Sequence, residues 1–274
     1  INRKGKLEPI NLNKIIDRIN YLVNFIKPLK NIDVNGLIIE TINNVYSKVK
    51  TSELGEVTCR IALNKYMIHE DYGKLAARIS INNYLKNTGF KPFAISSEHK
   101  TIFDLKDILA SHIFESFVEF STEISEMMSE ERNYRYTYRG FIMLQKGQYL
   151  LGGIESPDFA TMRVSLGIIA GRERLQRNQL PHLKELYLLL SSKTFTFATP
   201  TLLNSGTKYA QFSSCVLLDV QDDLLNIGEQ IKSSMMYQKH SAGIGINLSK
   251  LRSRGSKIKG TNGIASGLAP LCEV

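Results

Sequence analysis

The sequence predicts a protein of mixed α+β and α/β class, in which two helical regions precede the first elements of an α/β domain. Apolar residues recur at helical spacing through much of residues 11–193. Glycine and proline punctuate these segments, and the last third has the order strand, helix, strand. The length of 274 residues corresponds to about two domains of ordinary size.

The first ninety residues are expected to form a short strand pair over residues 1–8 and then four helices. Asn11 is a suitable N-cap for the first helix, whose apolar positions run from Leu12 to Ile26. The other helices are expected over 33–48, from a cap at Thr51 to near His69, and over 72–87, where Gly89 ends the last one.

Residues 91–193 are expected to form a helical connecting region. Four acidic residues there lie near i, i+4 spacing, a pattern that fits either metal ligands or an exposed helix face, and the exposed face is favoured. They are Glu115, Glu119, Glu123 and Glu126. Arginine and tyrosine alternate over 132–139, which indicates an extended stretch or a packed loop. We therefore expect no metal site.

The last third, residues 194–274, changes to an α/β pattern. Strands are expected over 195–199, 212–220 and 244–248, because these segments are rich in β-branched and aromatic residues or form short apolar runs. A helix is expected over 223–239. Strand, helix, strand is the order of a parallel α/β unit.

Composition excludes several classes of protein. Hydrophobic residues make up 43% and charged residues 22% of the chain, as in ordinary globular proteins. No run of 18 apolar residues predicts a membrane span, and no basic-then-apolar leader predicts secretion. Three scattered cysteines do not form a disulfide scaffold or a zinc site, so we expect a reducing, cytoplasmic setting. Both ends of the chain are expected to be cut.

The net charge of +9 is concentrated unevenly. No acidic residue occurs between Glu229 and Glu273, whereas five basic residues fall within positions 250–259. This segment lacks the interleaved aromatic residues or helix motif of a nucleic-acid site, so small phosphorylated ligands are favoured over nucleic acid. Its glycines fit neither the dinucleotide fingerprint nor the P-loop, because Thr261 and Asn262 replace the Lys-Ser/Thr pair. A flexible anion-binding loop and a plain surface loop both remain open.

Cys215 lies at the start of a predicted strand, directly after Ser213 and Ser214. A lone cysteine at such a position is often a small core residue. The hydroxyl groups nearby in sequence, including Thr199, also fit a thiol that does redox or radical chemistry. The residues alone leave both interpretations open.

Five separated segments carry a family resemblance when they are taken together: 198–207 (ATPTLLNSGT), 213–215 (SSC), 222–223 (DD), 241–245 (SAGIG) and 252–263 (RSRGSKIKGTNG). In order and spacing they closely resemble the large (alpha) subunit of class I, aerobic ribonucleotide reductase. Residues 1–90 resemble the ATP-cone that precedes the catalytic domain in that family, notably at 8–15, 50–52 (KTS) and 75–78 (LAAR). The resemblance implies an ATP-cone over 1–90, a helical connecting region over 91–193, and the start of a ten-stranded α/β barrel over 194–274.

The resemblance also implies an activity and its residues. The family reduces ribonucleoside diphosphates to deoxyribonucleoside diphosphates by thiyl-radical chemistry, and Cys215 matches one cysteine of its redox-active pair. Thr199 and Ser214 match substrate-contacting positions. The residues that match the specificity site for a deoxynucleoside triphosphate are Asp223, Leu224, Leu225, Lys239, Arg252, Lys259 and Gly260. The residues that match the ATP or dATP activity site are Arg3, Glu8, Pro9, Ile10, Asn11, Leu12, Asn13, Lys14, Thr51 and Lys86.

Partners follow from the same resemblance. It implies a homodimer, a separate metal-containing small (beta) subunit that supplies the radical, thioredoxin or glutaredoxin as reductant, and no cofactor in this chain. The radical cysteine and the second redox cysteine would lie beyond Val274, and Cys272 is expected to be a buried structural residue. The chain alone is therefore expected to be inactive.

Gly55 replaces a polar residue of the family's activity site. From this we hypothesise that ATP binds but dATP inhibits weakly; strong dATP inhibition of a complete enzyme would contradict this.

Other interpretations also bear on this sequence. A noncatalytic nucleotide-sensing protein, or one piece of a split reductase, would share the nucleotide-binding segments without the remaining cysteines. An ATP-cone repressor is disfavoured because the cysteines are not grouped as in a zinc ribbon. Class II, cobalamin-dependent reductases share several of the five segments, so the source of the radical is a separate expectation.

Overall fold

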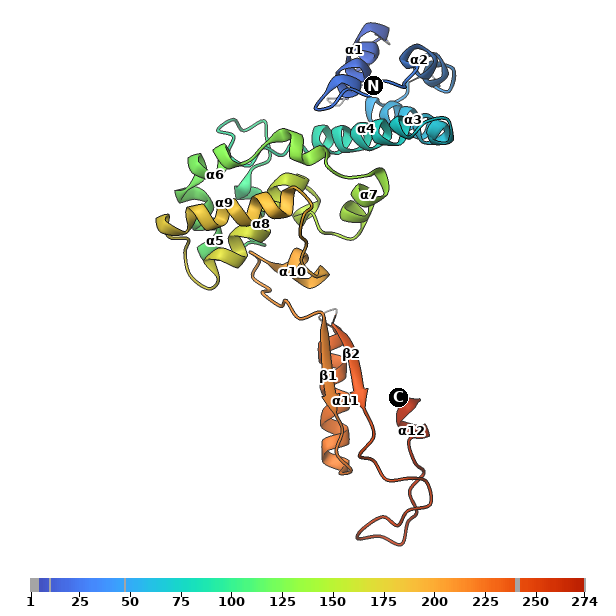
Figure 1. Ribbon diagram of the computed structural model, residues 1–274, viewed down its shortest axis with the longest axis vertical. Helices are drawn as coiled ribbons and strands as arrows, with labels where there is room; N and C mark the ends of the chain where they lie inside the picture. Colours follow the sequence, from blue (N-terminus) through green and yellow to red (C-terminus); the bar gives the residue numbers. More distant parts are fainter. Residues whose placement is uncertain (1–4, 10, 47, 240–241, 274) are drawn as a thin grey trace. The chain divides into compact units, whose positions relative to one another are not determined.

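The computed structural model describes residues 5–9, 11–46, 48–239 and 242–273, which form two compact units (Figure 1). The first unit comprises Ile1–Thr196 and Ser205–Tyr209, and the second comprises Phe197–Asn204 and Ala210–Val274. The chain thus enters the second unit at Phe197, returns to the first at Ser205, and leaves it again after Tyr209. The first unit is helical and the second is α/β, as the sequence predicts.

Four α-helices open the first unit: α1 (Leu12–Asn24), α2 (Val34–Asn43), α3 (Thr51–Asn64) and α4 (Glu70–Thr88). The caps at both ends of this region are confirmed: Asn11 accepts a hydrogen bond from the Lys14 amide, and Gly89 ends α4 at a φ of 64°. The second helix is shorter than predicted and ends at Asn43, where the next residue, Asn44, donates its side-chain amide to the Glu40 carbonyl at 2.8 Å and so competes with the backbone for that acceptor. The third ends at Asn64, where a short 3₁₀ turn follows.

The expected strand pair over residues 1–8 is not seen in its described part. Residues 5–8 are exposed and belong to no strand, and residues 1–4 lie outside the described ranges. Gly5 has a φ of 79°, a turn conformation rather than an extended one.

The helical module is held by an apolar core and by one buried arginine. Residues of α1, α3 and α4 pack together with Phe141 and Leu150, which follow later in the chain. Arg78 of α4, 8% exposed, donates to the carbonyls of Leu22 (2.7 Å) and Lys27 (2.8 Å). These carbonyls lie in and just after the last turn of α1, where the helix itself supplies no donors. One side chain therefore both closes α1 and fixes it against α4.

The rest of the first unit is also helical: α5 (Ser111–Glu119), α6 (Ser121–Met127), α7 (Tyr138–Lys146), α8 (Pro157–Ala170) and α9 (Leu180–Ser191). Of the two alternatives expected over 132–139, an extended stretch and a packed loop, the extended stretch is wrong. Glu130–Tyr134 is a 3₁₀ helix, and Thr137 caps α7 by accepting from the Gly140 amide at 3.1 Å. Cap chemistry and burial of Tyr134 outweigh the alternating pattern.

The four glutamates of the connecting region lie on two helices, α5 and α6. Glu115 pairs with Arg174, and Glu123 pairs with Arg177 at 3.1 Å. Throughout the described ranges, no three His, Cys, Asp or Glu side chains gather as metal ligands. Nor does any described helix combine the length and apolar character needed to cross a bilayer.

A buried ion pair anchors the segment Ser205–Tyr209 in the first unit. Glu155 and Arg163 are both 0% exposed and meet at 2.8 Å, and the Arg163 guanidinium also donates to the Ser205 carbonyl at 2.6 Å. Gly206 follows at a φ of 78°, and a Cβ on Gly167 of α8 would lie 2.3 Å from its amide nitrogen. The Gly206 carbonyl accepts from the Ala110 amide at 3.1 Å.

The second unit is built on two parallel strands joined by a helix: β1 (Cys215–Asp219), α11 (Leu224–Lys239) and β2 (Gly243–Asn247). The register pairs Cys215 with Gly243 and Asp219 with Asn247. This confirms the predicted strand, helix, strand order, with a shorter first strand and a second strand of the predicted length displaced by one residue. Two short helices, α10 (Thr199–Asn204) and α12 (Ala269–Cys272), complete the unit.

The strand expected over 195–199 is wrong, since Thr199 begins a helix instead. Pro200 occupies the first turn of α10, where its missing N–H costs nothing and its fixed φ suits a helix. The Leu202 amide donates to the Ala198 carbonyl at 3.2 Å, which starts the helical ladder. The β-branched and aromatic content of the segment is thus outweighed by a helix start signal.

We predict that Glu155→Gln lowers the free energy of unfolding by about 3 kcal/mol or more, because it leaves the Arg163 guanidinium buried beside a neutral amide. Urea unfolding at pH 7, followed by far-ultraviolet circular dichroism, measures the change. The control is Arg174→Ala at the exposed pair with Glu115, with an expected loss below about 1 kcal/mol. Equal, small effects of both substitutions would contradict a structural role for the buried pair.

Candidate functional site

Cys215 begins β1 with its side chain exposed. It pairs in register with Gly243, and a Cβ on that glycine would lie 3.7 Å from the sulfur. The Gly243 amide donates to the Ser214 carbonyl at 2.8 Å, which continues the pairing one residue before the strand. The thiol is therefore an accessible group at the amino end of the two-stranded sheet in this chain.

Ser214 and Thr199, the expected substrate contacts, are exposed residues of the same unit as Cys215. Thr199 starts α10, and the last residue of that helix, Asn204, donates its side-chain amide to the Gln211 carbonyl at 2.7 Å. This hydrogen bond ties α10 to the segment that leads into β1. Hydroxyl groups and a thiol thus occur on adjoining, connected segments.

Gln211 is a residue that sequence reasoning did not single out. Its side-chain Nε2 donates to the Ser213 carbonyl at 3.0 Å, while its Oε1 is buried and has no hydrogen-bond partner in the described part of the chain. A buried acceptor without a donor costs free energy, so this atom is suited to receive a hydrogen bond from a bound group. Nothing in the sequence distinguishes this glutamine from a surface residue.

The opposite, carboxyl end of the sheet carries acids and cations. Asp223 accepts from the Asn226 amide at 3.0 Å and so caps α11. Asp222 accepts from the Arg252 guanidinium at 2.8 Å. Asp219, the last residue of β1, accepts from Asn247 at 2.9 Å and from Lys250, and the hydrogen bond from Lys250 lowers the pKa of this carboxyl. Three carboxylates at positions 219–223 therefore lie at the same end of the sheet as two cations at positions 250–252.

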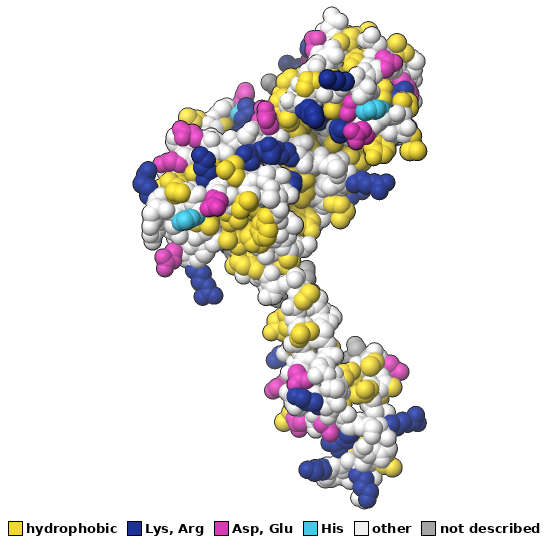
Figure 2. Space-filling model, in the orientation of Figure 1, with side chains coloured by type: hydrophobic (Ala, Val, Ile, Leu, Met, Phe, Trp, Pro, Cys, Tyr) yellow, Lys and Arg dark blue, Asp and Glu magenta, His cyan; other side chains and the backbone are white. Residues whose placement is uncertain are grey.

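Residues 253–267 form a hairpin arm that follows this cluster. Its two limbs are held by the amides of Gly255 and Ala265, which donate to the carbonyls of Ala265 (3.0 Å) and Ser256 (2.8 Å). Lys259 and Gly260 lie at its exposed turn, where Gly260 has a φ of 80°. Figure 2 shows Lys and Arg side chains gathered over the loop between β2 and α12. The arm presents positive charge and exposed backbone to solvent.

The structure brings together some of the expected specificity residues and separates one. Asp223, Arg252 and the hairpin arm lie at the carboxyl end of the strands, next to the exposed Leu224 and Leu225 at the start of α11. Lys239 ends the same helix, and 16 residues at 1.5 Å each place it about 24 Å away, at the end that leads into β2. Within one chain, Lys239 therefore does not join the Arg252 cluster.

The expected activity-site residues lie at helix ends of the first unit. Asn11, Leu12, Asn13 and Lys14 cap or begin α1, Thr51 begins α3, and Lys86 lies in the last turn of α4. Glu8 and Pro9 precede α1 and are exposed, whereas Arg3 and Ile10 lie outside the described residues. Helix N-termini supply unpaired amide donors, which suit phosphate groups.

Gly55 lies buried inside α3 against Asn83 of α4. A Cβ on Gly55 would lie 2.3 Å from the Asn83 side-chain nitrogen, and the Asn83 oxygen accepts from Arg18 of α1 at 2.5 Å. The absence of a side chain at position 55 of α3 thus leaves room for a polar contact between α1 and α4. The sequence shows the glycine but not the asparagine that fills its place.

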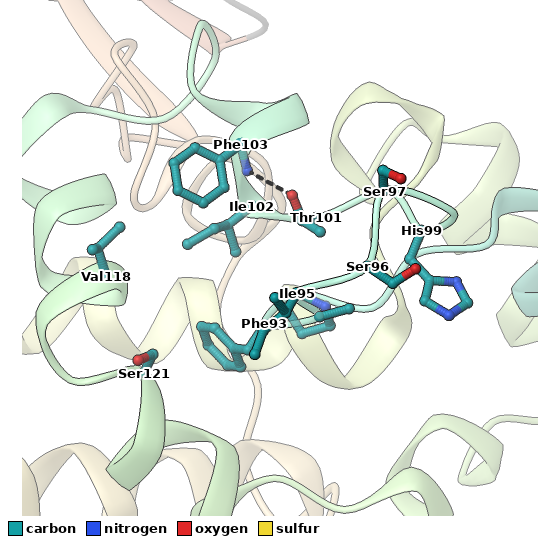
Figure 3. A pocket seen from close by; sticks show the side chains of 12 residues that line it. Phe93, Ile95, Ser96, Ser97, His99, Thr101, Ile102, Phe103, Val118 and Ser121 are labelled. Carbon is teal, nitrogen blue, oxygen red and sulfur yellow. Dashed lines mark hydrogen bonds between the residues drawn. The ribbon is translucent and has the colours of Figure 1, made fainter.

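A pocket of about 450 Å³ in the first unit holds none of the sequence-predicted residues (Figure 3). Figure 3 shows Phe93, Ile102 and Val118 around it, with hydroxyl groups from serine and threonine residues. Among the described residues that line it, His99 is the single titratable side chain. With no cation to meet a phosphate, the pocket is not the candidate nucleotide site.

Comparison with known proteins agrees with the resemblance. A family model described as "Ribonucleotide reductase, all-alpha domain" matches residues 134–210, and one described as "Ribonucleotide reductase, barrel domain" matches residues 213–274. The ribonucleoside-diphosphate reductase large chain of Cryptosporidium parvum is 35% identical over 286 residues, which cover 100% of this chain and 34% of that protein.

Two further relatives give the same result. Large chain 2 of Saccharomyces cerevisiae is 34% identical over 289 residues, and the large subunit of Variola virus is 33% identical over 286 residues. Each alignment covers 100% of this chain, but 32% of the yeast protein and 36% of the viral one. The chain therefore spans about a third of the length of these relatives.

We predict that the three thiols differ sharply in reactivity. Cys59 is buried and its thiol donates to the Ala76 carbonyl at 3.3 Å, and burial raises its pKa to about 12. Cys215 is exposed, and so is Cys272, contrary to the burial expected for it, because its four-residue helix α12 buries no residue. At pH 8, N-ethylmaleimide should label Cys59 on the order of a thousandfold more slowly than an exposed thiol.

Peptide mass spectrometry of the native chain over time measures this difference, and the unfolded chain, in which all three thiols should react alike, is the control. The sign follows from the raised pKa: the reactive thiolate of Cys59 should become abundant only as pH approaches 12. Slow labelling of Cys215 in the native chain would contradict its exposed position.

Proposed function

Because the chain belongs to the ribonucleotide reductase large-subunit family, we propose that it takes part in reducing ribonucleoside diphosphates to deoxyribonucleoside diphosphates. The observation that carries this proposal is the exposed Cys215 thiol at the start of β1, within the segment that the barrel-domain model matches. The radical that starts the reaction is proposed to come from a separate metal-containing small subunit.

The chemistry asked of Cys215 is that of a two-electron donor. Two thiols become one disulfide, and their electrons and protons convert the ribose 2′-hydroxyl into water and a C–H bond. A thiol beside the sugar can also protonate the leaving hydroxyl. The exposed hydroxyls of Ser214 and Thr199 are proposed to hydrogen-bond the diphosphate and ribose of the substrate. Cys59 belongs to the core of the first unit, and Cys272 is not assigned to the reaction. We therefore propose that the partner thiol comes from another part of a large subunit.

We propose a second site at the carboxyl end of the strands, for a deoxynucleoside triphosphate that sets substrate specificity. Asp223 keeps one carboxylate oxygen for a ribose hydroxyl while the other caps α11. Arg252 and the hairpin arm supply cations and amides for the phosphates, aided by the absence of acids from 230 to 272. Lys239, at the far end of α11, is proposed to serve this site from the second copy in a homodimer, where the exposed Leu224 and Leu225 also find cover.

A third site, for ATP or dATP, is proposed at the starts of α1 and α3 and the end of α4. The amides that begin α1 and α3, with Lys86 of α4, fit a triphosphate. Gly55 supports the proposal that dATP inhibits weakly, because Asn83 fills the space of the polar side chain expected there. The division into an ATP-cone over 1–90, a connector over 91–193 and a barrel from 194, with a ten-stranded barrel in the complete subunit, is part of the proposal. So are a cytoplasmic setting and thioredoxin or glutaredoxin as reductant.

The proposed catalysis is tested by Cys215→Ser in a complete large subunit that carries this chain. Reduction of ribonucleoside diphosphates should fall at least about a thousandfold, because an alcohol cannot close a disulfide. The matched control is Cys272→Ser, an equally exposed cysteine that is not assigned to the reaction and should retain activity. Retention of full activity by Cys215→Ser, measured with the small subunit and a dithiol reductant, would falsify the assignment.

The proposed specificity site is tested in the chain itself by calorimetric titration with dTTP and with ATP. Arg252→Ala should abolish measurable dTTP binding, because it removes the planar donor that best matches a phosphate. ATP binding at the first unit should be unchanged, and serves as the internal control for folding. Equal dTTP affinity in both proteins would place the triphosphate elsewhere.

A further inference from the structure

Two of the basic residues in the acid-free stretch are engaged by acids from an earlier segment. Arg252 Nε lies 3.0 Å and 2.8 Å from the two carboxylate oxygens of Asp222, 30 positions earlier in the sequence. Lys250 is engaged in the same way by Asp219. Arg254, Lys257 and Lys259 are exposed and pair with no acid among the described residues. Two of the described cations at this end of the second unit are therefore paired with carboxylates, and three are not.

Arg252 makes a second contact that Lys250 does not. Its Nη1 donates to the Lys257 carbonyl at 3.0 Å, and Lys257 pairs with Ile264 across the hairpin arm. The guanidinium therefore joins Asp222, next to the start of α11, to the first limb of the arm. Its side chain is 28% exposed and that of Asp222 is 35% exposed, so the contact is partly shielded from water.

These contacts leave one edge of the guanidinium available. An arginine has five N–H donors in a rigid plane, and here Nε is directed to Asp222 and one Nη1 donor to Lys257. Nη2 has no hydrogen-bond partner within the ranges that the structure describes. A phosphate accepts two N–H groups from the Nη edge of an arginine, so the orientation imposed by Asp222 matters for binding.

We propose that Asp222 is a positioning residue of the specificity site: it fixes Arg252 by Nε, so that the Nη edge is presented to the triphosphate while Nη1 keeps the hairpin arm in place. This inference rests on the specificity site proposed above. The two neighbouring acids then have different roles: Asp223 caps α11 and faces the ribose, and Asp222 orients the phosphate-binding arginine.

A different role for Asp222 makes the opposite prediction. If its carboxylate acted only as a counter-charge to Arg252, it would repel a triphosphate, and its removal would strengthen binding. If it orients Arg252, its removal weakens binding even though the site becomes more positive. The sign of the change in affinity therefore separates the two roles.

The first experiment titrates dTTP into the chain and three variants by calorimetry at fixed salt. Asp222→Ala should weaken binding by about fivefold to tenfold. Asp222→Asn should stay within about threefold of the unchanged chain, because its amide oxygen still accepts from Nε. The matched control Asp219→Ala, which removes the same charge from Lys250, should not weaken binding. Equal or tighter binding by Asp222→Ala would overturn the positioning role.

The second experiment needs no nucleotide. Hydrogen exchange of the Ile258 and Ala265 amides, which donate to Gly263 (3.1 Å) and Ser256 (2.8 Å), reports on the hairpin arm. Exchange should be about threefold faster or more in Asp222→Ala and unchanged in Asp219→Ala. Unchanged exchange in Asp222→Ala overturns the inference, whereas failure of the unchanged chain to bind dTTP overturns the proposed specificity site.

Discussion

The ion pair between Glu155 and Arg163 is the constraint on which the path of the chain depends. Both side chains are removed from water, so their charges are stable only with partners, which include each other, the Leu151 amide and the Tyr149 and Ser205 carbonyls. The pair therefore fixes where Ser205–Tyr209 lies in the first unit. In sequence, α10 directly precedes this anchor, and β1 begins six residues after it.

The order strand, helix, strand distributes the chemistry of the second unit between two ends. A parallel crossover returns the chain to the end at which it began, so Cys215 and Gly243 share the amino end, and Asp219 and Asn247 share the carboxyl end. The proposed redox thiol and the proposed triphosphate site are thus held apart by a rigid unit. Lys239 falls on the thiol end by the same geometry, which is why the proposed triphosphate site takes this lysine from a second copy.

The sequence predicts the helical elements and the α/β unit well, because apolar spacing, caps and glycine stops act locally. Asn11 and Gly89 lie where their chemistry predicts; β1 starts three residues after its predicted start and ends one residue before its predicted end, and β2 is displaced by one residue. Local pattern failed at 195–199 and 132–139, where Pro200 and Thr137 supply helix starts that composition does not reveal. The contacts of Asp219 with Lys250 and of Asp222 with Arg252 could not be predicted, since they join residues 31 and 30 positions apart.

The charge pattern of the sequence does not reveal which cations are paired with acids in the fold. From the sequence, the acid-free stretch suggests five unpaired cations over 250–259, yet two of them are held by Asp219 and Asp222, which come from before α11. An unpaired arginine on a flexible loop has many rotamers, and binding an anion would have to order it. An arginine already fixed by a carboxylate loses less freedom on binding. An acid beside a phosphate site can therefore favour binding through orientation while opposing it through charge, and at Arg252 the partly shielded geometry favours orientation.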